Sequence, residues 1–164
     1  MLEFDWDLAE LEKKGSFTFL EYTPEKVKTM LEEGGGTIET VVLKKKIDRI
    51  VIDSITSFAL LFDDDLKKRE AALDLFSMLR KWECTSLLTY EEEPMAEIRA
   101  TSKTLEFESD SLIAIYFLRT GKSRERFIEV LKMRGTKHSR EIFPFSIDKK
   151  GISVSSKAFK GKVK

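Results

Sequence analysis

The spacing of apolar and polar residues divides the chain into helical and extended segments. Residues 65–82 place apolar side chains three and four positions apart, which predicts a helix with one face in the core. Residues 49–52, Arg-Ile-Val-Ile, form a continuous apolar run that stops at Asp53. A run without alternation is typical of a strand buried on both faces of a parallel sheet, and residues 84–90 predict the next strand.

Turn residues and helix caps mark the other elements of the N-terminal half. Thr23 and Pro24 indicate a helix start, because threonine caps a first turn and proline fits the first helical position. Glycines at residues 34–36 predict a connector between this helix and a second one. The remaining expected elements are a short helix near residues 5–15, a strand at 17–22, the second helix at 37–46 and an apolar loop at 58–62.

Antiparallel strands dominate the expected C-terminal half. Residues 111–118 predict another buried strand, and residues 124–133 return beside it with partial alternation, which indicates a hairpin. A final strand pair is expected at residues 143–147 and 152–154, and a short helix at 105–109. With the helices and strands of the first half, this order predicts an α/β protein.

The composition is that of a globular protein with a highly charged surface. The 164 residues are 41% hydrophobic and 35% charged, enough for one domain with a sizeable core, which we place at residues 1–164. Lysine plus arginine equals aspartate plus glutamate, at 29 each. The zero net charge therefore gives no argument for nucleic acid or an anionic membrane as a partner.

Cysteine and histidine are too rare for a disulfide framework or a structural zinc site. Cys84 is the single cysteine and His138 the single histidine. One cysteine excludes an internal disulfide and agrees with a cytoplasmic location. We also expect no signal peptide and no membrane span, because the N-terminus is acidic and no apolar run is long enough.

The first candidate for chemistry is Asp53, which follows the predicted strand at residues 49–52. Ligands of open α/β sheets bind beyond the carboxyl ends of the strands, and Ser54, Thr56 and Ser57 add hydroxyl groups there. Nucleotide-hydrolysing enzymes need a carboxylate at this place to hold Mg²⁺, usually through water. On these residues alone, the simpler interpretation is a buried strand that leads into an Asp-Ser turn.

No phosphate-binding P-loop motif occurs within these 164 residues. Gly121, Lys122 and Ser123 match the end of the motif, but the position where its first glycine belongs is Tyr116. The motif also requires a following helix, whereas residues 124–133 predict a strand. We therefore interpret residues 121–123 as a hairpin turn.

The second candidate is the run from Lys132 to His138, which combines cations, a glycine, a hydroxyl and an imidazole at a strand end. Such a cluster can bind phosphate through its charge and through bidentate hydrogen bonds from arginine. A solvated loop explains the same residues equally well.

The motifs taken in order resemble one protein family. They are residues 5–8, 11–12, 49–57, 69–70, 89–91, 131–138, 143–145 and 150–152. Their order and spacing resemble the C-terminal part of a KaiC-type ATPase domain of the RecA superfamily. The most specific pieces are Leu-Lys-Met-Arg-Gly-Thr-Lys-His at 131–138 and Phe-Pro-Phe at 143–145.

This resemblance implies an α/β, RecA-like three-layer sandwich with a mostly parallel sheet and C-terminal antiparallel strands. In the family, a P-loop strand and helix, and a strand with two water-activating glutamates, precede the part that resembles residues 5–8. Neither is found within residues 1–164, so we assign no catalytic residue and leave open whether the chain is an enzyme. ATP and Mg²⁺ are the cofactors that the resemblance implies, although the chain alone lacks the phosphate cradle.

The resemblance also implies roles for individual residues. Asp53 is similar to the Walker B aspartate that holds Mg²⁺, and Thr89 lies at the sensor-like strand end, so we expect adjacent parallel strands. Five residues fall on positions that reach the nucleotide of a neighbouring subunit in the family's rings: Lys132, Met133, Arg134, Thr136 and His138. Lys132 and Arg134 would act as arginine-finger cations.

The functional prediction is a KaiC-like ATPase domain that is incomplete and not catalytic alone. The alternatives are a non-catalytic protein-interaction module and a recombinase-like DNA-binding protein, against which the zero net charge counts. Expected partners are further copies of the chain, as in the family's hexameric rings, or a chain that bears the P-loop. Without the P-loop strand, residues 84–90 and 111–118 would have unpaired edges or would pair with each other.

Overall fold

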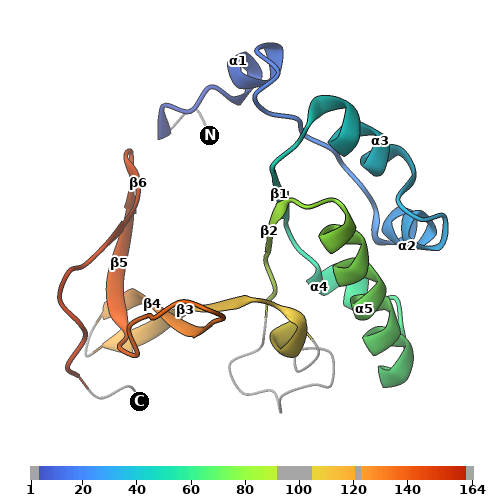
Figure 1. The fold of residues 1–164 in the computed structure, drawn as a ribbon. Helices are drawn as coiled ribbons and strands as arrows, with labels where there is room; N and C mark the ends of the chain where they lie inside the picture. Colours follow the sequence, from blue (N-terminus) through green and yellow to red (C-terminus); the bar gives the residue numbers. More distant parts are fainter. Residues whose placement is uncertain (1–3, 92–104, 121–122, 162–164) are drawn as a thin grey trace. The chain divides into compact units, whose positions relative to one another are not determined.

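The computed structural model describes residues 4–91, 105–120 and 123–161 (Figure 1). The chain forms two compact units, each with its own sheet. Residues 21–109 form the parallel unit, and residues 1–20 with 110–164 form the antiparallel unit. The expected α/β fold, with a parallel sheet and C-terminal antiparallel strands, is confirmed. That both units make one domain stays a prediction.

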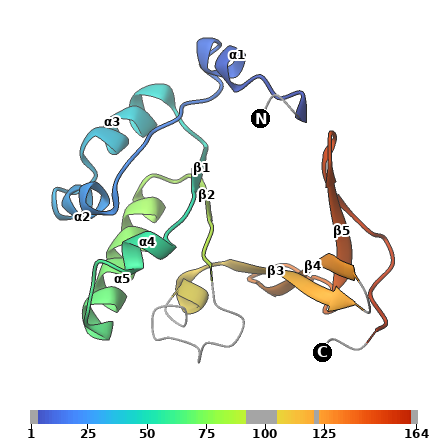
Figure 2. The same cartoon turned by 180° about the vertical axis from the view of Figure 1, so that it is seen from behind.

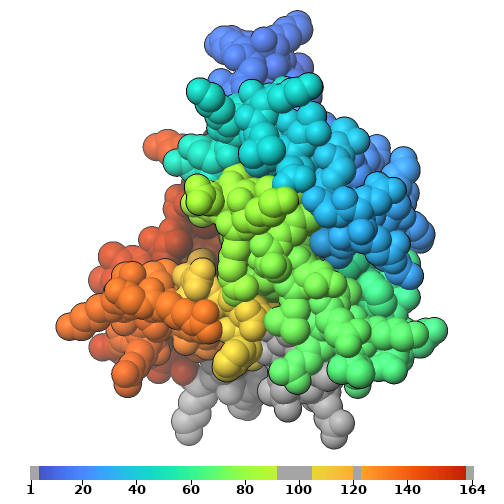
Figure 3. All heavy atoms as spheres, turned by 45° about the vertical axis from the view of Figure 1, so that its right-hand side comes forward, coloured from blue at the N-terminus to red at the C-terminus, as the bar shows by residue number. Residues whose placement is uncertain are grey.

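The parallel unit is built from helices and two strands. Its elements are α2 (Pro24–Glu32), α3 (Gly36–Lys45), β1 (Arg49–Ile52), α4 (Thr56–Ala59), α5 (Asp65–Lys81) and β2 (Thr85–Leu88). Strands β1 and β2 pair in parallel, as expected, with Ile52 opposite Leu88. Helix α2 packs against both α3 and α5 (Figure 3). The short helix expected at residues 105–109 spans residues 105–108.

Two helix starts follow directly from their sequences. The Thr23 hydroxyl oxygen accepts a hydrogen bond from the Lys26 N–H at 3.4 Å, and Pro24 fills the first position of α2. The Asp64 carboxylate accepts a hydrogen bond from the Leu66 N–H at 2.6 Å and starts α5. Both side chains satisfy backbone donors that a first helical turn leaves unpaired.

The core of the parallel unit lies between its helices and one face of the sheet. Its buried residues are Met30, Val42, Ile55, Leu75, Met78, Leu79 and Trp82. Ile50, Ile52 and Leu88 of the strands pack against them. On the other face, Val51 and Leu87 are 65% and 56% exposed. The prediction that β1 is buried on both faces is therefore wrong, because its core contacts lie on one side only.

The antiparallel unit contains a short N-terminal helix and a four-stranded sheet (Figure 2). Its elements are α1 (Leu8–Lys13), β3 (Ser111–Thr120), β4 (Ser123–Met133), β5 (Phe143–Asp148) and β6 (Gly151–Val154). The strand order is β3-β4-β5-β6, and every neighbouring pair is antiparallel. The predicted hairpin and final strand pair are confirmed, while residues 121–122 of the hairpin turn lie outside the described residues.

The two faces of this sheet differ in burial. Phe127 is fully buried on one face, and its ring centroid lies 4.7 Å from that of Phe159. On the other face Ile113, Ile115 and Phe117 are 46%, 63% and 54% exposed. The expectation that β3 is a buried strand is therefore wrong, because its alternate residues face away from the packed side.

Two expectations about local structure are corrected. Residues 17–22 form no strand, and Phe19 is 69% exposed there. Residues 58–62 are not purely loop, because α4 extends to Ala59 and buries Phe58.

Of the two alternatives for the edges of β2 and β3, the sheets show the first. The two strands belong to different sheets and do not pair with each other, so each has one strand neighbour among the described residues.

Candidate functional site

Asp53 and Thr89 follow the two parallel strands and contact each other. Because Ile52 lies opposite Leu88, the next residue of each segment falls at the same edge of the sheet. The Thr89 hydroxyl donates a hydrogen bond to Asp53 Oδ1 at 2.6 Å. This is the short distance typical of a hydroxyl bound to a carboxylate. The predicted placement of both residues at the ends of adjacent parallel strands is confirmed.

Backbone hydrogen bonds hold this pair in register beyond the strands. The Thr89 N–H donates to the Ile52 carbonyl at 3.0 Å, and the Ile55 N–H donates to the Thr89 carbonyl at 3.1 Å. Ile55 is itself buried in the core of the parallel unit. The position of the Asp53 carboxylate is thus fixed from both sides by contacts with residue 89 and its neighbours.

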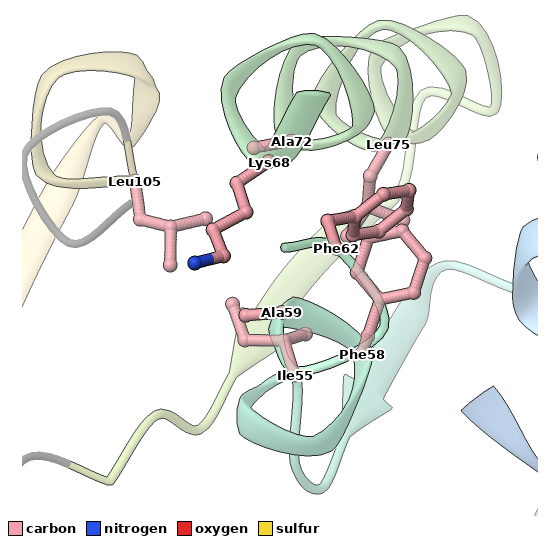
Figure 4. A pocket seen from close by; sticks show the side chains of 8 residues that line it. All are labelled: Ile55, Phe58, Ala59, Phe62, Lys68, Ala72, Leu75 and Leu105. Carbon is pink, nitrogen blue, oxygen red and sulfur yellow. The ribbon is translucent and has the colours of Figure 1, made fainter. Parts of the chain in front are cut away.

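The segment after Asp53 is anchored by apolar packing between α4 and α5 (Figure 4). Phe58 and Phe62 meet edge to face with their ring centroids 5.3 Å apart. A hollow of about 10 Å³ remains between these elements, with the Lys68 amino group pointing into it. A space of this size holds roughly one water molecule, so this hollow is a packing defect rather than a ligand site.

Thr56 joins the two segments that leave the sheet. Its hydroxyl oxygen accepts a hydrogen bond from the Glu91 N–H at 2.9 Å. Thr56 stands out in the sequence only as one of several hydroxyl residues after a strand. Its role as an acceptor depends on the pairing of β1 with β2, which the sequence alone does not show.

The Asp53 carboxylate suits a hydrated Mg²⁺ ion. Mg²⁺ keeps several water ligands and binds one or two carboxylates together with substrate phosphates. Asp53 is exposed, and its hydrogen bond from Thr89 fixes the orientation of one carboxylate oxygen. Within the described residues, no group of three His, Cys, Asp or Glu side chains could enclose a metal. The donor set therefore fits contact with a hydrated ion better than an all-protein metal cage.

The other expected residues lie together in the turn that follows β4. Lys132 and Met133 are the last residues of β4, and the chain turns from Arg134 onwards. Gly135 adopts a φ of +67°, which favours glycine. Arg134 and Thr136 are exposed, whereas Lys132, Met133 and His138 are partly buried. These five residues belong to the antiparallel unit, and Asp53 and Thr89 belong to the parallel unit.

Asp110 positions the start of this turn. The Arg134 N–H donates to the Asp110 carbonyl at 2.8 Å, and Arg134 Nη1 lies 3.4 Å from Asp110 Oδ1. Sequence reasoning missed Asp110, because its proximity to Arg134 depends on the pairing of Ser111 with Met133. The hydrogen bond fixes the backbone while 46% of the Arg134 side chain stays exposed.

The largest change in acidity lies outside both groups of expected residues. Burial raises the pKa of Tyr116 to about 12, and its hydrogen bond to the Glu129 carboxylate adds to the shift. Burial also raises the pKa of the Cys84 thiol, and the charge of Asp48 adds to it. Both groups therefore stay protonated at neutral pH and supply no charge to a site.

Comparison with known families and proteins places these residues in context. The family model described as "ATPase: KaiC" matches residues 1–158. The circadian clock protein KaiC3 of Synechocystis is 31% identical over 163 residues, which cover 94% of this chain and 32% of that protein. The circadian clock oscillator protein KaiC of Synechococcus elongatus is 29% identical over 92% of this chain and 30% of its own length.

A solved structure shows the same fold over most of the chain. The KaiC-like protein PH0186 from the archaeon Pyrococcus horikoshii OT3 superimposes with a TM-score of 0.78 at 30% identity. The match covers 94% of this chain and 67% of that one, and the chain spans about a third of the curated relatives' length. Among the described residues, no helix is both long and apolar enough for a membrane span.

Proposed function

The chain belongs to the KaiC ATPase family, and we propose that it supplies the Mg²⁺-facing and neighbour-facing parts of an ATP-hydrolysing domain. The observation that carries this proposal is the 2.6 Å hydrogen bond between Thr89 and Asp53 at the carboxyl edge of two parallel strands. This edge is where ligands bind in open α/β sheets. A threonine that contacts the metal-facing carboxylate can also respond to changes at the bound phosphate.

In this proposal Asp53 would accept hydrogen bonds from the water ligands of a nucleotide-bound Mg²⁺ ion. The bound ion would supply positive charge that neutralises the phosphates. Thr89 keeps the carboxylate in one orientation, because its hydroxyl is held at Asp53 Oδ1. The backbone bonds of Ile55 and Thr89 limit the movement of this carboxylate. Such preorganisation is valuable because the groups need not rearrange during phosphoryl transfer.

The Lys132–His138 turn serves the nucleotide of a neighbouring subunit in this proposal. Arg134 is exposed, and its backbone is tied to Asp110 at the base of the turn. An arginine that projects from a fixed backbone can approach a γ-phosphate and stabilise its charge in the transition state. Lys132, Met133, Thr136 and His138 would line the same contact, with Thr136 as a further hydrogen-bonding group.

The chain completes its site only with a segment that bears a P-loop. Residues 1–164 contain no Gly-Lys-Ser or Gly-Lys-Thr in a P-loop context and no assigned water-activating carboxylate. Val51 and Leu87 are exposed on a parallel sheet, a type of sheet that is normally covered on both faces. We expect a P-loop strand and helix, on this or another polypeptide, to cover that face.

The metal and nucleotide roles can be tested separately by NMR on the 164-residue chain. Mn²⁺, a paramagnetic substitute for Mg²⁺, should broaden the amide signals of Asp53 and Thr89 in wild type but not in Asp53→Asn. Asp48→Asn is the matched control, because Asp48 is an exposed carboxylate just before the opposite end of β1. Broadening that survives Asp53→Asn, or that disappears equally in Asp48→Asn, would contradict the proposed metal role.

ATP with Mg²⁺ in the same experiment tests the neighbour-facing turn. The signals of residues 132–138 should shift, and Arg134→Ala should weaken that effect. Lys149→Ala is the control, because Lys149 is an exposed cation beside another turn of the same unit. If both variants weaken the ATP-induced signal shifts equally, the shifts report only general attraction between cations and phosphate.

The association state of the chain tests whether it requires a second chain to complete its sheet and its site. Within the described residues, β2 and β3 each keep one edge without a strand neighbour, and such edges are templates for further strands. The 164-residue chain should therefore self-associate or bind a P-loop-bearing partner. Light scattering over a dilution series measures the first outcome. A monodisperse monomer of 19.0 kDa at every concentration would reject self-association.

A further inference from the structure

The hydrogen-bond ladder between β1 and β2 continues past the last residue of each strand. Residues two apart in an extended segment direct their backbone groups to the same neighbour. The Thr89 N–H donates to the Ile52 carbonyl at 3.0 Å, and the Thr89 carbonyl accepts from the Ile55 N–H at 3.1 Å. The next N–H that faces the first segment is therefore that of Glu91.

The first segment meets Glu91 with a side chain, because its backbone has already turned into a helix. Helix α4 begins at Thr56, and the Ile55 carbonyl accepts a helical hydrogen bond from the Ala59 N–H at 3.2 Å. The Thr56 hydroxyl oxygen accepts the Glu91 N–H at 2.9 Å. One side chain thus extends the ladder by a step beyond the point where the two backbones part.

Thr56 is held in place by the residues around it. Ile55 and Phe58 are 5% and 8% exposed, and both line the small hollow between α4 and α5 (Figure 4). A threonine side chain also has few rotamers, because its β-carbon is branched. The backbone of α4 therefore sets the position of the Thr56 hydroxyl, and the Glu91 N–H meets a fixed acceptor.

The same bond makes Thr89 an internal residue of the ladder instead of its last residue. Residues at the end of a paired segment open more easily than residues between bonded neighbours. With Glu91 bound to Thr56, Thr89 lies between hydrogen-bonded positions on both sides. Thr89 is itself β-branched, so a fixed backbone also fixes its hydroxyl, which donates to Asp53 Oδ1 at 2.6 Å.

We propose that Thr56 is a positioning residue: by binding the Glu91 N–H, it keeps the Thr89 hydroxyl on the Asp53 carboxylate. Glu91 is exposed, so water can satisfy its N–H, and the bond contributes order and does not serve to pair a buried donor. The other anchor of this segment is Tyr90, which packs against the core. The consequence for metal binding rests on the Mg²⁺ role proposed for Asp53.

Amide hydrogen exchange on the metal-free 164-residue chain tests the positioning directly. Thr56→Val keeps the shape of the side chain and removes the acceptor. Exchange should become at least about threefold faster at Glu91, Thr89 and Ile55, but should stay unchanged at Thr85, whose bonded N–H lies at the other end of the ladder. Thr56→Ser keeps an oxygen at this position and should restore the wild-type rates. Thr56→Ala, which also lacks the acceptor, replaces the valine variant if circular dichroism shows that the latter loses its fold.

A Mn²⁺ titration followed by NMR supplies a readout that a merely structural role would not move. The Mn²⁺ concentration that half-broadens the Asp53 amide signal should rise by about three- to tenfold in Thr56→Val and return to the wild-type value in Thr56→Ser. Because Thr56 acts through Thr89, Thr56→Val should have no further effect in a Thr89→Val background. Thr85→Val, the same change at the opposite end of β2, should leave the midpoint unchanged.

Three results would overturn the inference. Unchanged exchange at Thr89 in Thr56→Val would show that the packing of Tyr90 alone holds the segment. Exchange that becomes equally faster at Thr85 would indicate a general loss of stability. Additive effects of Thr56→Val and Thr89→Val on the Mn²⁺ midpoint would show that the two hydroxyls act separately. A wild-type chain without Mn²⁺ broadening at Asp53 would instead contradict the proposed metal role, and the exchange rates would still decide whether Thr56 holds Thr89.

Discussion

The two candidate groups of residues are held in different ways. Asp53 is fixed by partners distant in sequence, through the Thr89 hydroxyl and the paired backbones of β1 and β2. Arg134 is fixed at its backbone by the Asp110 carbonyl, while its side chain, paired with the Asp110 carboxylate, stays 46% exposed at the start of a turn. A group that orients a metal within its own subunit gains from rigidity. A cation that must reach another subunit needs a fixed backbone and an exposed side chain.

The same contrast appears in the faces of the two sheets. The parallel sheet is packed through Ile50, Ile52 and Leu88 and exposes Val51 and Leu87. The antiparallel sheet is packed through Phe127 and exposes Ile115 and its neighbours. Each unit thus has one completed face and one apolar face open to solvent. The open faces mark where further chain is expected, and the completed faces should carry the stability.

The largest effect is expected on the packed face of the antiparallel sheet. Phe127→Ala should lower the free energy of unfolding by about 3–5 kcal/mol, because it removes a fully buried ring and leaves a cavity. Ile115→Ala on the opposite face of the same sheet, where the side chain is 63% exposed, should cost about 1 kcal/mol or less. Urea denaturation measures both, and equal losses would show that this opposite face is packed in solution.

A smaller effect is expected at the Asp53 carboxylate. Thr89→Val keeps the shape of the side chain and removes the hydroxyl that donates to Asp53. The cost should be about 1 kcal/mol, because Asp53 is exposed and water can replace the lost donor. Thr85→Val, at the start of the same strand, is the matched control for the change itself. Unchanged stability in Thr89→Val relative to that control would show that the hydrogen bond does not hold in solution.

Alkaline pH should destabilise the antiparallel unit through Tyr116. Burial and Glu129 raise its pKa to about 12 from 10, so the folded state binds the phenolic proton more tightly than the unfolded state. This contribution to stability is complete below pH 10 and is lost as pH rises through about 12. The difference in unfolding free energy between wild type and Tyr116→Phe should therefore narrow over that range. A constant difference would contradict the assigned shift.

The smallest effect is expected for the turn. Arg134→Ala should change the unfolding free energy by less than about 1 kcal/mol, because its ion pair with Asp110 is exposed. The backbone bond to the Asp110 carbonyl remains in this variant. Thermal denaturation with and without salt measures the change, with Arg49→Ala, which removes another exposed pair, as the control. A large loss would mean that Arg134 is structural and is not reserved for a partner.

Local sequence signals predicted the elements better than their surroundings. The run before Asp53 predicted a strand that ends at a carboxylate, and Thr23 and Asp64 cap their helices through local chemistry. Burial was predicted less well, because Val51 and Ile113 are as apolar as buried strand residues yet remain exposed. Exposure depends on what packs against a face, and residue type does not report that.

The parts of the candidate site that depend on contacts between distant segments could not be predicted from the sequence. The residues of the Lys132–His138 turn adjoin in sequence, so their grouping was predictable, whereas the role of Asp110 required the register of β3 with β4. The proximity of Asp53 and Thr89 was predicted from the resemblance to a family, because the hydrophobic periodicity of the sequence does not show which strands are adjacent. Residues 17–22 show the reverse case, since an apolar run formed no strand and pairs with none of the described strands.

The central claim is that the chain holds the Mg²⁺-facing and neighbour-facing residues of an ATPase but not its phosphate cradle. ATP turnover by the 164-residue chain, compared with its Asp53→Ala variant, tests this most directly. The account predicts turnover at the background level for both, because residues 1–164 contain no P-loop motif to hold the phosphates. Turnover above background that Asp53→Ala abolishes would contradict it.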